Sequence, residues 1–222
     1  MDLMDIKWDK KEFESLVSTY GLAPEWEPEF PASGSIAGLP PYGKMTLYAD
    51  YFTMGNFRLP ITKFLMEVIK ALGVHLSQIH PRGIMRIRHF EFVCRANGVE
   101  PRVDKFAVFY KVSRRDGLFT CHASSRKPFG KETTLVSSGW EHKFFWISDK
   151  VIPELMVRRL ATEPVIGLTA ASTKNQDWVR KLTVPLTQMK VLPEEALVWA
   201  GMSRLWPPCG LEPVFIGVDE RK

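Results

Sequence analysis

The sequence predicts an α+β fold that is mostly helical, with a small antiparallel sheet made of a β-hairpin or of three strands. Two observations support this class. Apolar residues recur at helical spacing through residues 61–110, and the pattern then changes to short β-prone runs on either side of residues 116–117. With 222 residues, 45% hydrophobic and 12% aromatic, the chain is long enough to bury a sizeable core.

The N-terminal region predicts one short helix and one extended segment. Residues 8–20 place apolar side chains on one face of a helix, with Asp9 as the N-cap and Gly21 at the end. Residues 23–45 contain five prolines, and proline removes a backbone donor from helices and sheets alike. We therefore expect this segment to run extended over the surface, so that residues 1–41 form an N-terminal helix and linker.

The next part of the chain predicts three consecutive helices. The first covers residues 61–72, with Pro60 at the first helical position and Gly73 at the stop. The second covers residues 81–97, starts after His80 or Ser77 and ends at Asn97-Gly98. A third, shorter helix follows Pro101 and places Val103, Phe106 and Tyr110 on one side.

Strands and further helices are predicted after residue 110. Asp116-Gly117 between two β-prone runs indicates a hairpin, and residues 142–148 form a strand rich in aromatic residues. We expect Trp140, Phe144 and Trp146 to act as core or interface anchors. In the C-terminal third, helices are predicted within residues 151–160 and 172–183, and after Pro193 as the first helical residue.

Charge is distributed unevenly along the chain, whose net charge is +5. Residues 1–30 carry eight acids and three lysines (3 − 8 = −5), whereas residues 82–115 carry nine Lys or Arg and three acids (9 − 3 = +6). A basic excess of this size either forms a solvated face or attracts a polyanion.

The helix predicted at 81–97 carries much of this basic excess, and its pattern bears on whether the charges bind a polyanion. On a helical projection Arg88 and Arg95 share one side with Glu91 and pair with it, while apolar residues fill two separate arcs. A helix with two apolar arcs packs between neighbours, which favours a core helix over one that reads DNA. The alternative is a phosphate-contacting patch made of Arg82, Arg86, His89, Arg102, Lys105, Arg114 and Arg115.

Signatures of catalysis, metal binding and cofactor binding do not occur in the sequence. We find no P-loop, no G-x-S-x-G, no H-E-x-x-H and no G-x-G-x-x-G, and the five histidines show no ligand spacing. The catalytic alternative that remains is a hydrolase. Its nucleophile would be either Cys121, paired with His142 across the sheet, or Ser138. We therefore predict no enzyme, no metal, no cofactor and no small-molecule substrate.

Several features predict an intracellular protein, nuclear or cytoplasmic. The N-terminus carries acids where a secretory signal would carry basic residues, and no segment has the roughly 20 apolar residues that span a bilayer. The three cysteines lie far apart without a C-x-x-C motif, which fits reduced thiols.

Four stretches, in this order, resemble one known family, the plant gypsy-type transposon domain: "GVHLSQIHP", "GVEP", "GWEHKFFWI" and "ALVWAGMSRLW". The similarity covers about residues 42–206 and leaves 207–222 as a C-terminal tail. It implies an origin in a plant long-terminal-repeat retroelement. It implies no established activity, so no catalytic residue is carried over.

Two functions from different classes follow. The first is a non-enzymatic, gag-like structural domain that acts through protein partners or self-association, with weak non-specific nucleic-acid binding. The alternative is a winged-helix-like DNA-binding module, with helices at 61–72, 81–97 and 101–110 and the hairpin as the wing. A third helix covered by residues 177–206 would count against the DNA-binding module.

Overall fold

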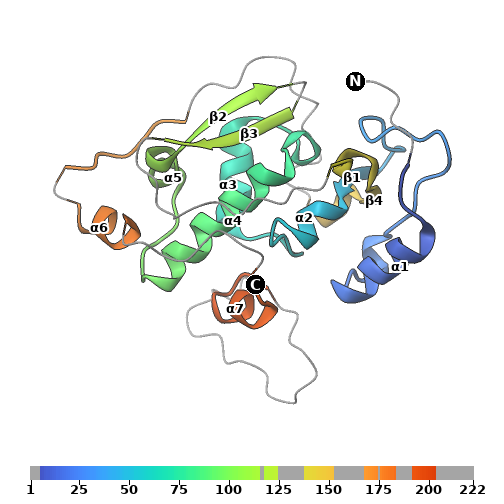
Figure 1. Cartoon of the computed structure of the whole chain (residues 1–222), viewed down its shortest axis with the longest axis horizontal. Helices are drawn as coiled ribbons and strands as arrows, with labels where there is room; N and C mark the ends of the chain where they lie inside the picture. The colour runs from blue at the N-terminus through green and yellow to red at the C-terminus, as the bar shows by residue number, and fades with distance from the viewer. Residues whose placement is uncertain are drawn as a thin grey trace.

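The protein has the α+β architecture that the sequence predicts, with more helix than strand. The computed structural model describes residues 6–115, 118–124, 138–152, 168–174, 176–183 and 192–203. Within these residues it contains seven α-helices and two separate two-stranded antiparallel sheets. Figure 1 shows helix α4 (Pro81–Ala96) at the centre, with the hairpin β2–β3 on one side and the β1–β4 sheet and α1 at the other end.

The first helix, α1 (Lys10–Thr19), forms where it was predicted because Asp9 and Glu12 make a capping box at its N-terminus. Asp9 Oδ1 accepts from the Glu12 amide at 2.8 Å, and the Glu12 carboxylate accepts from the Asp9 amide at 3.0 Å. Its inner face buries Phe13 and Leu16. Just before it, Trp8 Nε1 donates to the Phe144 carbonyl at 3.1 Å, which ties the N-terminal segment to the distant strand β4.

The proline-rich segment after α1 leads into the first sheet. It holds a short 3-10 turn, Pro24–Trp26, and is bridged at Glu29 to Trp146. It was expected to run extended, but after this bridge it makes turns at residues 33–34, 37–38 and 42–43. Strand β1 (Lys44–Tyr48) pairs with β4 (Phe144–Ser148) in the register Lys44↔Ser148. The sequence predicted β4 but not β1, because β1 is five residues long and mostly buried on both faces, so it shows no alternating pattern.

Helices α2 (Ala49–Thr53), α3 (Lys63–Leu72), α4 and α5 (Val103–Phe109) follow in turn. Three of them were predicted; α2 was not. Pro60 was expected at the first position of α3, but Thr62 caps this helix and Pro60 lies outside it. His80 caps α4, as one of the two predicted starts, and Gly73 ends α3 in the left-handed region at φ 67°.

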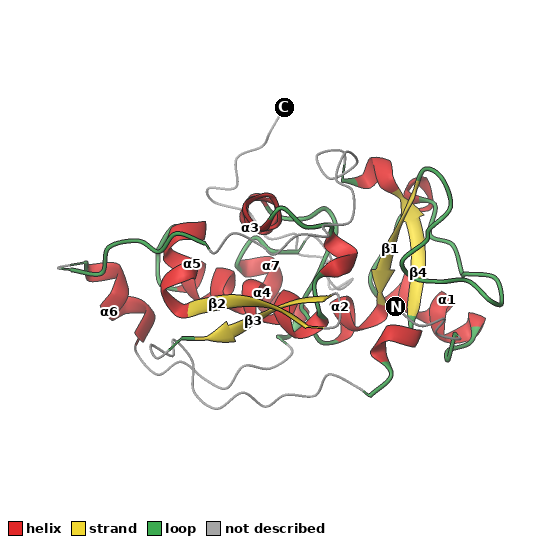
Figure 2. Ribbon diagram, turned by 90° about the horizontal axis from the view of Figure 1, so that it is seen from above, coloured by secondary structure: helices red, strands yellow, loops and turns green. Residues whose placement is uncertain are grey.

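The predicted hairpin consists of β2 (Tyr110–Arg115) and β3 (Leu118–Ala123). Its strands pair from Tyr110↔Ala123 to Arg115↔Leu118, and Asp116 and Gly117 lie outside the described residues. Tyr110 starts β2 and was expected on the third helix. Strand β3 packs along α4 (Figure 2). The His80 amide donates to the Phe119 carbonyl at 2.8 Å.

Two further helices lie in the C-terminal part of the chain, α6 (Asp177–Thr183) and α7 (Glu194–Trp199). Pro193 precedes α7 as its N-cap, whereas it was expected to be the first helical residue. Short 3-10 turns at Trp140–His142 and Asp149–Val151 flank β4. Of the helix predicted within 151–160, residues 153–160 lie outside the described part. None of the helices in the described ranges is both long and apolar enough to cross a membrane.

Candidate functional site

Helix α4, which carries most of the charges of interest, is wedged inside the protein. Twelve of its sixteen residues are buried, among them Arg86, Arg88, His89 and Glu91. The helix contacts β3 on one side and α2 and α3 on others. This confirms the prediction that the helix packs between apolar neighbours and does not present one long free face.

A buried polar centre forms around Arg88 and Glu91, both of which are 0% exposed. Arg88 Nη1 donates to Glu91 Oε2 at 2.7 Å and to Thr62 Oγ1 at 2.9 Å, and Thr62 in turn donates to Glu91 at 2.8 Å. Arg95 completes the carboxylate's shell with bonds of 3.1 and 2.9 Å to Oε1. Burial lowers the pKa of the Arg88 guanidinium, and the charge of Glu91 opposes this shift.

The same arginine joins three parts of the chain that are far apart in sequence. Its Nε donates to the Asn56 carbonyl at 3.1 Å, and its Nη2 donates to the Met202 carbonyl at 2.9 Å. A fully buried guanidinium is stable only when its donors are satisfied, and here the partners are a carboxylate, a hydroxyl and two carbonyls. The polar centre is therefore built to hold segments together.

A second ion pair lies beside the first and reaches α7. Arg58 Nε donates to Glu194 Oε2 at 2.9 Å, and Nη2 contacts the same oxygen. The guanidinium lies 4.5 Å from the centroid of the Tyr20 ring, a cation–π contact. The other Glu194 oxygen accepts from the Ser203 hydroxyl.

Neither Arg58 nor Glu194 was predicted as a residue of the site. The available signal was one arginine alone in the apolar run "GNFRLP", since an isolated charge among buried residues needs a partner. Its partner lies 136 residues away, beyond the reach of any local pattern.

The structure buries two of the seven residues predicted to contact phosphate. Arg86 and His89 are 6% and 3% exposed, so they cannot contact a polyanion on the surface, and this part of the prediction is corrected. Arg102 pairs with Asp104 at 2.8 Å, and Lys105 donates to the Glu100 carbonyl at 2.9 Å.

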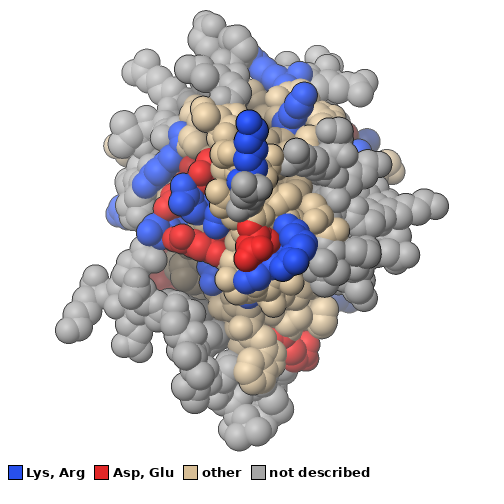
Figure 3. All heavy atoms as spheres, turned by 90° about the vertical axis from the view of Figure 1, so that its left-hand side faces the viewer, with Lys and Arg blue, Asp and Glu red and all other residues tan. Residues whose placement is uncertain are grey.

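The remaining members of the predicted patch lie at the start of α4 and on β2. Arg82 is half-buried at the start of α4, whereas Arg114 is exposed on β2 with its guanidinium 5.7 Å from the Phe119 ring centroid. Arg115 ends β2, and its side chain lies outside the described part of the structure. Figure 3 shows one face of the molecule, on which acidic side chains lie among the basic ones.

Helix α5 corresponds to the third helix of the winged-helix alternative. Helix α6 covers part of it. Trp178 packs against Phe109 with ring centroids 6.1 Å apart, and Lys105 Nζ lies 5.7 Å from the Trp178 ring centroid. The Ala171 amide also donates to the Asp104 carbonyl at 2.9 Å. A helix covered in this way lacks the free face needed to enter a major groove.

The residues proposed for a hydrolase are not assembled. Cys121 lies on β3 and His142 precedes β4, and these strands belong to different sheets, so the expected pairing across one sheet is wrong. Burial raises the pKa of Cys94 and Cys121 to about 12, and a thiol with so high a pKa is a poor nucleophile at neutral pH. Ser138 is an exposed turn residue.

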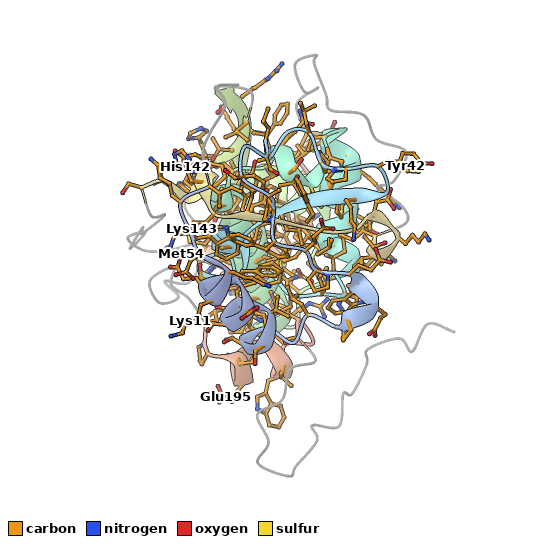
Figure 4. All side chains as sticks on the ribbon, turned by 90° about the vertical axis from the view of Figure 1, so that its right-hand side faces the viewer. Lys11, Tyr42, Met54, His142, Lys143 and Glu195 are labelled. Carbon is orange, nitrogen blue, oxygen red and sulfur yellow. The ribbon has the colours of Figure 1, made fainter. Side chains whose placement is uncertain are left out.

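The aromatic anchors and a groove lie at the other end of the molecule. Trp140, Phe144 and Trp146 all lie in the core. A groove of about 530 Å³ lies between α1 and α2, lined by residues that include Trp8, Lys11, Tyr20 and Asp50, and the Lys143–Glu12 ion pair of 3.2 Å lies at this groove. Figure 4 shows Lys11, Met54 and Lys143 along this side of the molecule.

Among the described residues, no three His, Cys, Asp or Glu side chains lie close enough together to hold a metal ion.

The centre of this arrangement, from the end of β1 through α2, α3, α4 and α5 into β2, coincides with a known protein family. Residues 47–114 match the family model described as "Putative gypsy type transposon". Over these residues the chain is similar to the gypsy-type transposon family, as the sequence resemblance predicted, although that resemblance was expected over about residues 42–206. Searches among curated proteins and among solved structures give no match.

Proposed function

We propose that the chain is a non-enzymatic, gag-like domain of a plant retroelement that works inside the cell through protein contacts, including contacts between copies of itself. The observation that carries this proposal is that several of its charged residues form ion pairs within the fold. Arg58, Arg88 and Arg95 each hold a carboxylate within the fold, so their chemistry is structural. Buried thiols with raised pKa values support the same conclusion.

Weak, non-specific nucleic-acid binding is the second component of the proposal. The exposed cations on β2, Lys111 and Arg114, favour it, since cations on a surface strand can contact phosphate without reading bases. Such contacts are sensitive to salt because each one releases counterions from the nucleic acid. The binding is therefore a property of the surface and not of helix α4.

The experiment is a measurement of mass in solution, with and without duplex DNA, together with a gel-shift titration across salt. We expect self-association without DNA, and gel retention at about 50 mM salt that is lost by about 200 mM. The double variant Lys111→Gln/Arg114→Gln should retain less DNA than the control Lys10→Gln on α1. Retention of one DNA sequence over others at about 200 mM salt would establish the DNA-binding module instead.

A further inference from the structure

The segment 192–203, which contains α7, reaches the gypsy-type domain through three directed polar contacts. The Leu192 amide donates to Asn56 Oδ1 at 2.9 Å, Arg58 binds the Glu194 carboxylate, and Arg88 donates to the Met202 carbonyl at 2.9 Å. We call this segment the C-terminal clasp. We call the groups that bind it, on Asn56, Arg58 and Arg88, the acceptor site.

The apolar residues of the clasp are not part of the main core. Leu197, Val198 and Met202 are buried, yet the continuous hydrophobic cluster formed by the described residues does not include them. The clasp makes hydrogen bonds and an ion pair with the described body, and these fix its position through specific partners.

The acceptor site is held in place without help from the clasp. Arg58 Nη1 donates to the Phe52 and Phe57 carbonyls at 3.2 and 2.7 Å, and the Tyr20 ring supports the guanidinium. Arg88 is fixed by Glu91 and by the Asn56 carbonyl. A site whose donors are already positioned loses little conformational entropy on binding, so it can accept the same segment from any source.

We propose that the acceptor site binds the C-terminal clasp of a second copy of this chain, in exchange for its own. The exchange makes the same contacts in trans as in cis, so the charge complementarity of Arg58 and Glu194 is kept, and swapping an identical element is a low-cost route to a dimer. Each acceptor site then contains Leu192, Glu194 and Met202 of the other copy. This inference rests on the proposed function and identifies the surface used for self-contact.

Charge exchange between Arg58 and Glu194 tests the proposal in the full-length chain. Arg58→Glu and Glu194→Arg each place like charges at the pair within one chain, so each variant alone should be monomeric. Mixed in equal amounts, they restore both opposite-charge pairs only between chains, and we expect a mixed dimer of twice the 25.4 kDa chain mass. The double variant restores the pair within one chain and serves as the folding control. Lys63→Glu, at an exposed ion pair, is the matched surface control.

A mixture that stays at the monomer mass, while the double variant is folded, overturns the proposal. If a single variant does not fold, native mass spectrometry on two differently tagged copies of the unaltered chain decides. Hybrid dimers whose abundance rises with concentration, and in which a cross-link joins segment 192–203 of one copy to residues 56–58 of the other, support the exchange, whereas monomers alone overturn it. Hybrid dimers in which these cross-links form only within one copy overturn the clasp exchange but leave the proposed function standing, because the copies then meet through another surface.

Discussion

Glu91 is the residue on which the buried charge of α4 depends. Its two oxygens accept from Arg88, Thr62 and Arg95, so one carboxylate satisfies two guanidinium groups and a hydroxyl. The sequence predicted both arginine pairs from their spacing along the helix. Their depth could not be predicted from that spacing, and depth decides the energetic effect of losing the carboxylate.

Replacing Glu91 with Gln should lower the free energy of unfolding by about 3–5 kcal/mol, because it leaves the Arg88 charge buried without a counter-charge. The measurement is chemical denaturation followed by circular dichroism. Glu67→Gln is the matched control, since Glu67 forms an exposed pair with Lys63, and its loss should change the value by less than about 1 kcal/mol. Equal effects from the two variants would contradict the structural role of the buried centre.

His80 gives the protein a specific dependence on pH. Desolvation, followed by the charge of Arg82, lowers the pKa of this residue to about 4, although Glu141 opposes the shift. The neutral Nδ1 accepts from the Arg82 amide at 3.0 Å, which caps α4. Between about pH 6.5 and pH 4 the unfolded chain binds a proton at His80 that the folded chain does not bind, so folding becomes less favourable as pH falls.

We expect the free energy of unfolding of His80→Asn to change less between about pH 6.5 and pH 4 than that of the wild-type chain. Asparagine keeps a capping oxygen and does not titrate. The wild-type chain should lose up to about 3 kcal/mol more than the variant between pH 7 and pH 4. Urea denaturation at each pH measures the difference. His122→Asn, at an exposed position on β3, controls for the loss of an imidazole. Parallel profiles for wild type and His80→Asn would show that His80 titrates alike in both states.

Among the elements, those with local signals were predicted and those that depend on distant partners were not. Caps and helical spacing were enough for α1, α3 and α4, and a two-residue turn was enough for β2 and β3. Strand β1 exists because β4 lies beside it, and its partner in the register Lys44↔Ser148 is about a hundred residues further along. No periodicity in either strand alone specifies that pairing.

Helix α1 offers a test of a local signal. Asp9→Ala removes the side-chain acceptor of the capping box, and we expect the free energy of unfolding to fall by about 1 kcal/mol. Glu14→Ala is the control, because Glu14 is exposed and forms a 3.9 Å pair with Lys10 that contributes only a few tenths of a kcal/mol. Thermal or chemical denaturation reads out both variants. No loss in Asp9→Ala would mean that α1 is positioned by packing alone.

At the scale of the whole molecule, the candidate site could be predicted only in part. The conclusion that α4 is a core helix was correct because two apolar arcs on one helix require two neighbours. Arg86 and His89 were placed on the surface wrongly, because a helical projection does not show which arc the neighbouring hairpin covers. The clasp contacts at Arg58 and Arg88 join residues more than a hundred positions apart, so only the fold reveals them.

The described structure extends well beyond the segment that matches the family, and this gives a whole-molecule prediction. A fragment of residues 47–114 lacks β3 and β4 and most of β1, together with the Met202 carbonyl that binds Arg88. We expect this fragment to show no cooperative unfolding transition. Helix α4 would expose its apolar arcs to water, and Arg88 would lose one of its hydrogen-bond acceptors. Circular dichroism on heating, with the full chain as reference, measures this. A sharp transition in the fragment would show that 47–114 folds alone.

The bond between Arg88 and Met202 also sets an order of events on the ribosome. The two residues are 114 positions apart, so after Arg88 has been synthesised the ribosome must add the whole of that interval before the carbonyl exists. At roughly 5–20 residues per second this takes on the order of 6–23 seconds. During that time the Arg88 guanidinium of the nascent chain lacks one hydrogen-bond acceptor. A chaperone, or the clasp of a second copy that has already been synthesised, can then bind at this position.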